Sequence, residues 1–504
     1  MVNKYKSVVT NTWFKLLAAL IFSCILVLSA ARLHPAKQAE QGASLETMTA
    51  HLESRIPELM KTYEIPGVSM ALVQNNKVVW TQAFGFADIE AGRKMTANTI
   101  CRVQSISKPV TAWGVMKLVE QDKIDIDKPV SFYLKNWTHP ESEFSEKDIT
   151  IRQLLSHSAG MPLGDILTRY APQEDMPSLE EKLSMEAHLI QEPGTSFSYS
   201  NTGYNLLELL IQEVTGMRYA EYMEQEILDP LGMAHASFEW SLEFDPPVPV
   251  GYNLKGEEIP VYVYPEKASG GLFATAEDIA KFALAGMQDS PQEVLSTASI
   301  DELYKPMAKE MGMYSLVFDA YGLGHYIENI PVGGIAVSHG GQGTGCMTHF
   351  HAVPEKGDAI VILTNSQRSW PFISYIMSDW AEWNGFSSVG MEAILFGQKV
   401  LWGIIGLTWF TVFLQAIRLA EGLILKKRRF APFAKDARFL RAVQGGMFVV
   451  LSAILIWCIS QPYLDITSIF PRASGWLGIS ILASAVVLLL SAFFPKRVNM
   501  SHIR

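Results

Sequence analysis

Cysteine is scarce in this sequence, with four in 504 residues. Cys24 and Cys458 lie inside long apolar runs, which leaves Cys101 and Cys346 as the one pair that an oxidising compartment could join. A fold held together by several disulfides is therefore excluded. The sequence is compatible with one disulfide or with two buried thiols, since free cysteines are often buried.

Positive charge is also scarce over most of the chain. The net charge is −10, but the residues from Met391 onward hold 13 Lys and Arg against 4 Asp and Glu, a net charge of +9, which leaves −19 for the residues before Met391. A region this acidic lacks the positively charged surface that binds the phosphates of nucleic acid, so no nucleic-acid partner is expected. Membrane topology and an anionic inner leaflet explain the basic tail better.

Clustered metal ligands, internal repeats and low-complexity segments are absent from the sequence as well. His349 and His351 would share one face of a strand, as two metal ligands could. No third ligand accompanies them at a suggestive spacing. We therefore expect no metal ion and no other cofactor.

What the sequence does contain is four long apolar runs. They cover residues 13–31, 400–417, 443–459 and 476–494, each close to the roughly 20 residues that cross a bilayer. Basic residues precede the first run, separate the second from the third and follow the fourth. By the positive-inside rule these flanks are cytoplasmic, which predicts a protein of the inner (cytoplasmic) membrane whose central domain lies in the periplasm or outside the cell.

The apolar runs also predict the domain organisation. Residues 1–31 form a signal peptide or an N-terminal anchor, because the small residues 29–31 suit a cleavage site but the run would serve equally as an anchor. Residues 32–43 are expected to be a linker and 44–390 an exported domain. Residues 391–504 form a membrane domain with three helices near 400–417, 443–459 and 476–494.

The exported domain alternates between strand-like and helix-like patterns. Strand-like runs cover 68–74, 78–85, 334–338, 347–352 and 358–364, and helix-like runs include 45–63, 110–121, 204–215 and 276–284. Asn75-Asn76 predicts a hairpin turn. Short turns between the last three strands favour an antiparallel sheet. We therefore expect an α/β (α+β) fold, an antiparallel sheet flanked by helices with a mostly helical subdomain, followed by three C-terminal transmembrane helices.

Ser105 and Lys108 are the strongest candidates for chemistry. Ser105-Ile106-Ser107-Lys108 opens an apolar helical stretch, and residues three apart lie on one helix face. A neutral Lys108 amine could then take the proton of Ser105, while the helix N-terminus favours both the neutral amine and an oxyanion. Alone the motif is weak, because a helix-capping serine and a solvated lysine explain it too.

Two later motifs change that balance. Tyr199-Ser200-Asn201 follows a Pro-Gly turn, and His339-Gly340-Gly341 ends a strand-like run. In this order the three motifs resemble the S-x-x-K, Y-x-N and K-T-G-like set of the serine β-lactamase and penicillin-binding-protein superfamily, in its class C-like, S12-type peptidase branch. The segments 67–73, 151–162, 231–233 and 268–275 resemble that superfamily as well. The resemblance implies a β-lactamase-like fold.

The resemblance also implies a role for each motif residue. Ser105 would attack a carbonyl and form an acyl-enzyme, after Lys108 and Tyr199 together remove its proton. Either neutral Lys108 acts directly as the base, or charged Lys108 stabilises the Tyr199 phenolate. The sequence leaves both states open. Tyr199 would then protonate the leaving amine and activate water for deacylation.

The remaining site residues are expected around the substrate. By resemblance, the backbone N–H groups of Ser105 and Gln342 would form the oxyanion hole, and Asn201 would donate to the acyl amide. Gly340 and Gly341 would let a substrate approach the strand edge, although a bulge explains them as well. His339 replaces the lysine common in the third motif, and it would bind a substrate carboxylate only if protonated.

The layout of one exported hydrolase domain and three membrane helices resembles the colibactin-type maturation peptidases of nonribosomal-peptide pathways. That resemblance implies a serine peptidase that removes an N-acyl-D-asparagine prodrug cap. Its partners would be an N-acylated peptide or peptide-polyketide substrate and the lipid bilayer. The same motifs would serve a D-alanyl-D-alanine carboxypeptidase, a β-lactamase or an esterase. The alternative of another class is a non-catalytic membrane protein that binds the cell wall.

Overall fold

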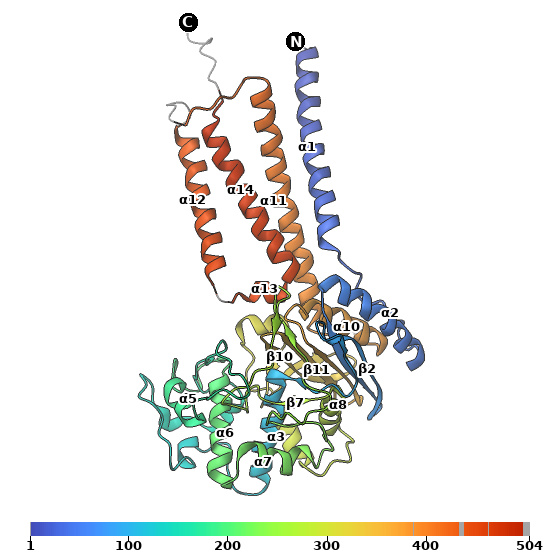
Figure 1. The fold of residues 1–504 in the computed structure, drawn as a ribbon, viewed down its shortest axis with the longest axis vertical. Coiled ribbons are helices and arrows are strands. Elements are labelled where there is room, and N and C mark those ends of the chain that lie inside the picture. Colours follow the sequence, from blue (N-terminus) through green and yellow to red (C-terminus); the bar gives the residue numbers. More distant parts are fainter. Residues whose placement is uncertain (1, 387, 433–437, 462, 497–504) are drawn as a thin grey trace. The chain divides into compact units, whose positions relative to one another are not determined.

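The structure is a computed structural model that describes residues 2–386, 388–432, 438–461 and 463–496. The chain divides into two compact units, shown as ribbons in Figure 1. Met1–Pro35 and Leu395–Arg504 form the first, which we call the helical unit. Ala36–Ile394 form the second, which we call the sheet unit.

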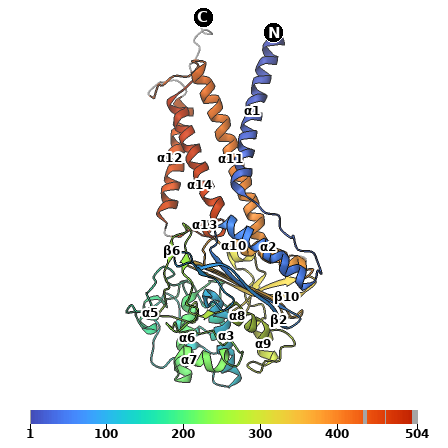
Figure 2. The same ribbon diagram turned by 45° about the vertical axis from the view of Figure 1, so that its right-hand side comes forward.

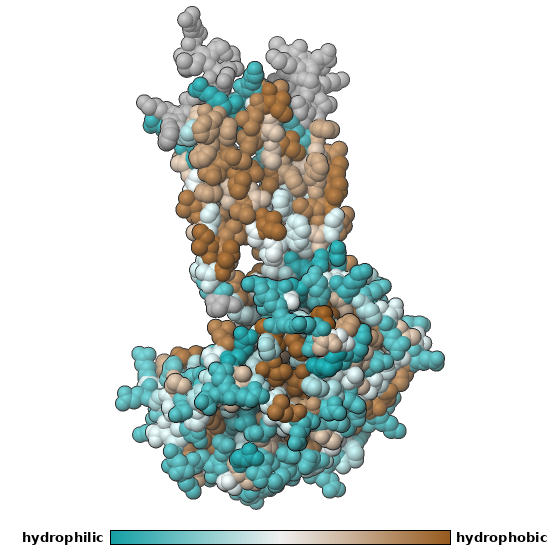
Figure 3. All heavy atoms as spheres, in the orientation of Figure 1, coloured by the Kyte–Doolittle hydropathy of each residue, from teal (hydrophilic) through white to brown (hydrophobic). Residues whose placement is uncertain are grey.

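The helices of the helical unit are long and apolar. Four helices in the described part of the chain have the length and composition to cross a membrane. They are α1 (Val2–Ala31), α11 (Glu392–Ile424), α12 (Arg438–Ser460) and α14 (Pro471–Phe493), and a short α13 (Asp465–Ile469) precedes the last. The four apolar runs of the sequence fall almost entirely within them. Their outward surface is mostly apolar, as the brown spheres in Figure 3 show.

Helix α1 packs against two other helices of the helical unit. Ala30 and Ala31 are buried in a cluster with α11 and α14, whose other members are Leu401, Trp402, Ile405 and Ala473. Ser23 donates a hydrogen bond to the carbonyl of Gly406 at 2.6 Å. Lys15 forms an ion pair with Glu421. These contacts give α1 apolar and polar partners along its length.

The sheet unit is built on one antiparallel sheet of eight strands, in the order β3-β2-β1-β12-β11-β10-β9-β8. The strands are β1 (Gly67–Gln74), β2 (Lys77–Asp88), β3 (Arg93–Lys94), β8 (Ala320–Tyr321), β9 (Tyr326–Ile330), β10 (Gly334–Gly343), β11 (Cys346–Val353) and β12 (Asp358–Thr364). All five predicted strands form. The predicted hairpin turn is confirmed, because Asn75 and Asn76 have φ of 49° and 59° between β1 and β2. Positive φ at both positions suits a type I′ turn.

Helices cover both faces of this sheet. Helix α8 (Ala276–Ala285) packs against β1, β2, β11 and β12. Helices α2 (Leu45–Tyr63) and α10 (Trp370–Trp383) pack on each other; α2 also packs on β2, and α10 on β12. Figure 2 shows both helices on the side of the sheet opposite α8. Because both faces are covered, every residue of β1 except its last is buried. The predicted antiparallel sheet flanked by helices is therefore confirmed.

A mostly helical part of the sheet unit lies between β4 and β7 in the sequence. Its helices are α3 (Ser107–Glu120), α4 (Ile151–Leu155), α5 (Leu179–Glu186), α6 (Asn201–Thr215) and α7 (Tyr219–Met223), and α9 (Thr297–Leu303) packs against α3. Two short strand pairs, β4 (Cys101–Arg102) with β7 (Phe273–Ala274) and β5 (Gly251–Tyr252) with β6 (Glu258–Ile259), complete it. Single turns are η1 (Gln104–Ile106), η2 (Val130–Phe132), η3 (Glu146–Asp148), η4 (Glu224–Leu228) and η5 (Gly312–Leu316).

Several elements extend beyond the predicted bounds, and α6 and β10 do so for a clear local reason. Helix α6 begins at Asn201, three residues before the expected start, because the Ser200 side chain caps it by accepting from the N–H of Gly203 at 2.8 Å. Strand β10 continues to Gly343, beyond the predicted end at residue 338. It continues because β11 pairs with it as far as Gly343 opposite Cys346.

Candidate active site

Ser105 lies in a tight turn at the start of α3. Gln104 has a φ of 54°, in the left-handed region that side chains other than glycine seldom adopt. The Gln104 amide is anchored, because its Nε2 donates to the hydroxyl of Tyr262 at 3.2 Å and to Sγ of Cys346 at 3.4 Å. The turn leaves Ser105 partly exposed just before α3, whose residues from Ser107 to Met116 are all buried.

Lys108 is completely buried one helical turn after Ser105. Its Nζ lies 2.8 Å from Oδ1 of Asn201, 2.8 Å from the carbonyl oxygen of Ser269 and 3.2 Å from Oγ of Ser105. The first two atoms can only accept, so Lys108 donates to both. Burial lowers the pKa of Lys108 well below its ordinary value. A neutral amine has two hydrogens for those acceptors and keeps its lone pair for the Ser105 hydroxyl.

Tyr199 completes the group around the serine. It shares a hydrogen bond with the side chain of Ser105, and its ring centroid lies 4.8 Å from Nζ of Lys108. Burial, and then the neighbouring Tyr314, raise the pKa of Tyr199 well above its ordinary value. Of the two protonation states that the sequence leaves open, the surroundings therefore favour neutral Lys108 as base and the Tyr199 phenol as proton donor.

His157 fixes the position of the Tyr199 segment. Its Nδ1 accepts a hydrogen bond from the backbone N–H of Ser200 at 3.1 Å, and its ring lies 4.4 Å from that of Tyr199. The ring is buried, and this burial lowers the pKa of His157 well below its ordinary value. The imidazole is therefore neutral, which Nδ1 needs in order to accept. His157 lies in the family-like segment 151–162, but no sequence motif assigns it a role in the site.

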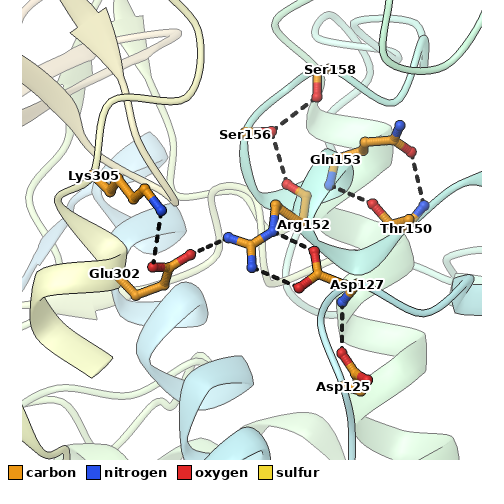
Figure 4. Close-up of polar contacts among 9 residues, drawn as sticks. All are labelled: Asp125, Asp127, Thr150, Arg152, Gln153, Ser156, Ser158, Glu302 and Lys305. Carbon is orange, nitrogen blue, oxygen red and sulfur yellow. Dashed lines mark hydrogen bonds and ion pairs between the residues drawn. The ribbon is translucent and has the colours of Figure 1, made fainter. Parts of the chain in front are cut away.

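An ion-pair network fixes the start of the segment that leads to His157 (Figure 4). Arg152 donates from Nε and Nη2 to the two carboxylate oxygens of Asp127, at 2.6 and 2.8 Å, and pairs with Glu302 from Nη1. Such a two-pronged contact holds a guanidinium in one orientation. Arg152 thereby ties α4 to α9 and to the 125–128 turn, five residues before the left-handed φ of 56° at His157.

Strand β10 carries the third predicted motif alongside the serine turn. An ideal Cβ on Gly341 would lie 2.2 Å from the carbonyl oxygen of Val103 and 2.2 Å from Oγ1 of Thr348. Any side chain at Gly341 would therefore push the strand away from the turn that holds Ser105. At Gly340 the same Cβ would meet the ring of Trp370 at 2.7 Å. Close packing is sufficient reason for both glycines. The pairing of β10 with β11 is regular at these positions, so they form no bulge, and the approach of a substrate to this strand stays a prediction.

His339 makes its polar contacts within the protein. Its Nδ1 donates to the carbonyl of Gly340 at 2.8 Å, and its Nε2 accepts from the hydroxyl of Tyr321 at 3.3 Å. Burial, and then Lys108, lower the pKa of His339 well below its ordinary value. A neutral ring with both nitrogens engaged does not suit the expected contact with a substrate carboxylate.

One open pocket with about 520 Å³ of empty space adjoins Ser105. Of the residues predicted for the site, Ser105, Asn201 and Gln342 line it, whereas Lys108, Tyr199, His339, Gly340 and Gly341 do not. Gln342 is oriented by Trp370, whose Nε1 donates to its Oε1 at 2.7 Å. The remaining lining residues are Gln104, Gly164, Asp165, Ile166, Glu186, Asn205, Tyr264, Glu266, Ser269, Gly270 and Gly343.

Several of these neighbours carry no sequence signal. The carbonyl of Ser269 holds Lys108, and buried Glu208 shapes that turn by accepting from the N–H groups of Lys267 and Ala268 at 2.6 and 2.8 Å. The family-like segment 268–275 is the signal that could have pointed to Ser269. Glu208 lies in no motif that the sequence shows.

The residues considered for metal binding and for a disulfide lie outside this pocket. His349 and His351 sit on β11 with ring centroids 6.0 Å apart. Among the described residues, no three His, Cys, Asp or Glu side chains gather so that they could hold a metal ion. Cys101 and Cys346 are both free thiols, and both line a second, small pocket.

Comparisons with known proteins match this arrangement. The family model described as Beta-lactamase matches residues 52–375. Protein flp of Staphylococcus aureus (strain N315) is 25% identical over 442 residues, which cover 85% of this chain and 86% of that protein. Penicillin-binding protein 4* of Bacillus subtilis (strain 168) is 25% identical over 371 residues, which cover 69% of this chain and 76% of that protein.

Solved structures show the same fold. The octameric penicillin-binding protein homologue from Pyrococcus abyssi has a TM-score of 0.59 at 28% identity, over 70% of this chain and 81% of that one. The β-lactamase/D-alanine carboxypeptidase from Yersinia pestis, complexed with citrate, has a TM-score of 0.54 at 21% identity, over 64% of this chain and 94% of that one. The second likeness concerns the fold alone.

Proposed function

Because this chain belongs to the beta-lactamase family of serine hydrolases, we propose that it is a membrane-anchored serine peptidase that hydrolyses an amide through an acyl-enzyme on Ser105. The observation that carries the proposal is the buried amine of Lys108, 3.2 Å from the Ser105 hydroxyl and held by two carbonyl oxygens. A lysine placed in this way can lose its proton near neutral pH and act as a base.

The proposed reaction has two halves. In the first, Lys108 takes the proton of Ser105 as Oγ attacks the substrate carbonyl, and the resulting tetrahedral oxyanion is held by backbone N–H groups of Ser105 and Gln342. Tyr199 gives its proton to the leaving amine, and the C–N bond breaks. In the second half Tyr199 takes a proton from a water molecule as the water oxygen attacks the ester carbonyl. The bond between the acyl carbon and Oγ then breaks, and Lys108 returns its proton to Ser105.

The finer part of the proposal concerns the substrate. We propose that the released acyl group is an N-acylated D-amino acid cap on a nonribosomal-peptide precursor, with D-asparagine as the cap residue that the domain layout suggests. The pocket supports a polar side chain there, because the side-chain amides of Gln104, Asn201, Asn205 and Gln342 line it. Amides can both donate to and accept from a carboxamide.

The proposal also places the protein in the cytoplasmic membrane, with its hydrolase domain in the periplasm or outside the cell. Helices α11, α12 and α14 would be the three C-terminal spans, which their length and composition support. The basic residues 426–429 lie between α11 and α12 in the sequence, where the positive-inside rule puts the cytoplasm. The contacts of α1 with α11 and α14 support an N-terminal anchor over a cleaved signal peptide.

The direct test is mass spectrometry of products from purified membranes. The substrates are a myristoyl-D-asparaginyl amide, its L-isomer and a D-Ala-D-Ala peptide, and Ser105→Ala is the control. Release of myristoyl-D-asparagine by the wild type alone would support the proposal. Cleavage of the D-Ala-D-Ala peptide instead would make the protein a cell-wall carboxypeptidase. Failure of a fluorophosphonate to label Ser105 would favour the non-catalytic, cell-wall-binding alternative.

A further inference from the structure

One end of the Ser105 pocket is rich in carboxylates. Asp165, Glu186 and Glu266 come from separate segments and all line it. Within the described part of the chain, Lys182 is the one cation that forms ion pairs with any of the three. Its Nζ lies 2.5 Å from Oε1 of Glu186 and 3.5 Å from Oδ2 of Asp165. Three acidic groups thus share a single positive charge, and Glu266 has no ion-pair partner among the described residues.

Asn205 provides a second and independent sign of a ligand at this end. It lines the pocket, and its side chain is 4% exposed. Its Nδ2 donates to Oε1 of Glu266 at 3.4 Å, but its Oδ1 accepts no hydrogen bond from any described residue. A buried acceptor left without a donor carries an uncompensated desolvation cost. A donor group in the pocket would remove that cost.

The pocket lies on the acyl side of the scissile bond. Ser105, Asn201 and Gln342 line it, whereas Tyr199, which would protonate the leaving amine, does not. The group that reaches the carboxylates therefore belongs to the part of the substrate that stays on Ser105. A primary ammonium suits this place, because it offers three N–H donors and one positive charge.

We propose that the acid-rich end of the pocket, made by Glu186, Glu266 and Asn205, binds a primary ammonium on the side chain of the acyl residue. This inference rests on the proposed function and names the substrate class of its site, which is an N-acylated D-diamino acid. Such a residue would take the place that the proposed function gives to D-asparagine, with a side chain of similar length in which a charged ammonium replaces the neutral carboxamide. Burial raises the pKa of Glu266; Lys182 lowers it in part, and Glu186 and Asp165 raise it. A bound cation would stabilise the ionised carboxylate.

The test compares three p-nitroanilides with the full-length protein in detergent. Their acyl residues, all myristoylated, are D-2,4-diaminobutyrate, D-norvaline and D-asparagine. D-Norvaline is the uncharged counterpart of diaminobutyrate and has a similar shape. We expect kcat/KM for the diaminobutyryl compound to exceed kcat/KM for each of the other two by about tenfold or more. A charge-assisted hydrogen bond typically contributes this much. Equal or better hydrolysis of the asparaginyl or norvalyl compound would overturn the inference and leave the proposed peptidase intact.

Variants locate the effect. Glu266→Gln and Glu186→Gln are expected to bring the ratio of diaminobutyryl to norvalyl hydrolysis close to one. The matched control is Glu180→Gln, which removes the same charge from an exposed position of α5 outside the pocket. A ratio that neither pocket variant changes would contradict the assignment. The burst of p-nitrophenyl acetate hydrolysis reports whether each variant retains a folded site. If a variant has no burst, the inference is judged from the substrate ratios of the wild-type protein alone.

A last arm separates this inference from the proposed function. If the wild type cleaves none of the anilides, the peptidase proposal fails. The primary amides of the same three N-acylated residues are then tested as inhibitors of p-nitrophenyl acetate hydrolysis. Stronger inhibition by the diaminobutyryl amide, by about tenfold, would uphold the ammonium site without the peptidase. Equal inhibition by all three would overturn it.

Discussion

The amine of Lys108 lies 3.2 Å from the hydroxyl of Ser105, and the two side chains meet one helical turn apart at the start of α3. Two carbonyl oxygens at 2.8 Å take the hydrogens of the amine. The lone pair of a neutral Lys108 is then available to the serine, without help from a carboxylate.

Replacing Lys108 by arginine should abolish acylation. An arginine stays charged in proteins and has no lone pair to take a proton. We expect Lys108→Arg to lower kcat/KM for a p-nitrophenyl ester by at least about 100-fold, the usual worth of a positioned base. Exposed Lys123→Arg is the matched control.

In the wild type, the lowered pKa of Lys108 predicts a rate that reaches its plateau well below pH 10. A rate still rising at pH 10 would contradict the neutral amine.

Removing the Tyr199 hydroxyl should trap the acyl-enzyme. Tyr199→Phe keeps the ring that packs 4.4 Å from that of His157, but removes the proton donor. With a p-nitrophenyl ester, whose leaving group needs no proton, acylation can still occur, and we expect kcat to fall by about 100-fold because deacylation is slowed. Intact-protein mass spectrometry should then show an acyl group retained on Ser105. Tyr133→Phe, away from the pocket, serves as the control. Normal turnover without an accumulated adduct would mean that another group moves the proton.

His157 should act as a positioning residue whose acceptor can be partly replaced. Asparagine tolerates the positive φ of 56° and offers a side-chain oxygen to the N–H of Ser200. We therefore expect His157→Ala to lower kcat by roughly tenfold or more and His157→Asn to restore part of it. Parallel measurement of Tm and KM separates positioning from stability. Equal kcat in both variants would show that the hydrogen bond to Ser200 is not what places Tyr199.

Stability should fall with rising pH because of Glu328. Its Oε2 accepts the N–H of Gly390 at 2.5 Å. Its Oε1 lies 3.7 Å from Nδ1 of His351 but makes no hydrogen bond with the described residues, and burial raises the pKa of Glu328 from 4.5 to about 8. The folded state therefore binds this proton more tightly than the unfolded state. The contribution of Glu328 is full below pH 4.5 and is lost as the pH rises to about 8.

Glu328→Gln stays neutral and should escape that loss. We expect its Tm to exceed that of the wild type by several degrees at pH 9, with a smaller difference at pH 5, as expected for a few kcal/mol. Thermal unfolding at both values measures the effect. The exposed Glu355→Gln should show no such trend. A wild-type Tm above that of Glu328→Gln at pH 9 would contradict the buried, raised pKa.

Helix α1 should remain in the mature protein. Ser23 bonds to α11, and Arg472 of α14 donates to the carbonyl of Ala30 at 2.9 Å. An N-terminal epitope tag is therefore expected to stay with the full-length protein in the membrane fraction. Loss of the tag, with a new N-terminus near residue 32, would identify a cleaved signal peptide instead.

The sequence by itself determined the features that depend on near neighbours. Ser105 and Lys108 meet because a three-residue spacing places them on one helix face. The turn at Asn75-Asn76 follows from residues that tolerate positive φ, and the strand-like runs predicted five of the eight strands in the sheet. Four apolar runs identified the four long helices. Each of these features follows from short-range geometry or from local composition.

The tertiary structure decided which groups are charged and what the pocket presents. Burial lowers the pKa of Lys108, and the segments around its amine include Asn201 and Ser269, which are 93 and 161 residues away in the chain. His339 turns inward because Tyr321 and its own strand satisfy its ring. Glu186 and Glu266 share no motif with Ser105, and only packing brings them to its pocket. Burial sets pKa values and pocket chemistry, and burial depends on contacts between distant segments that no local pattern encodes.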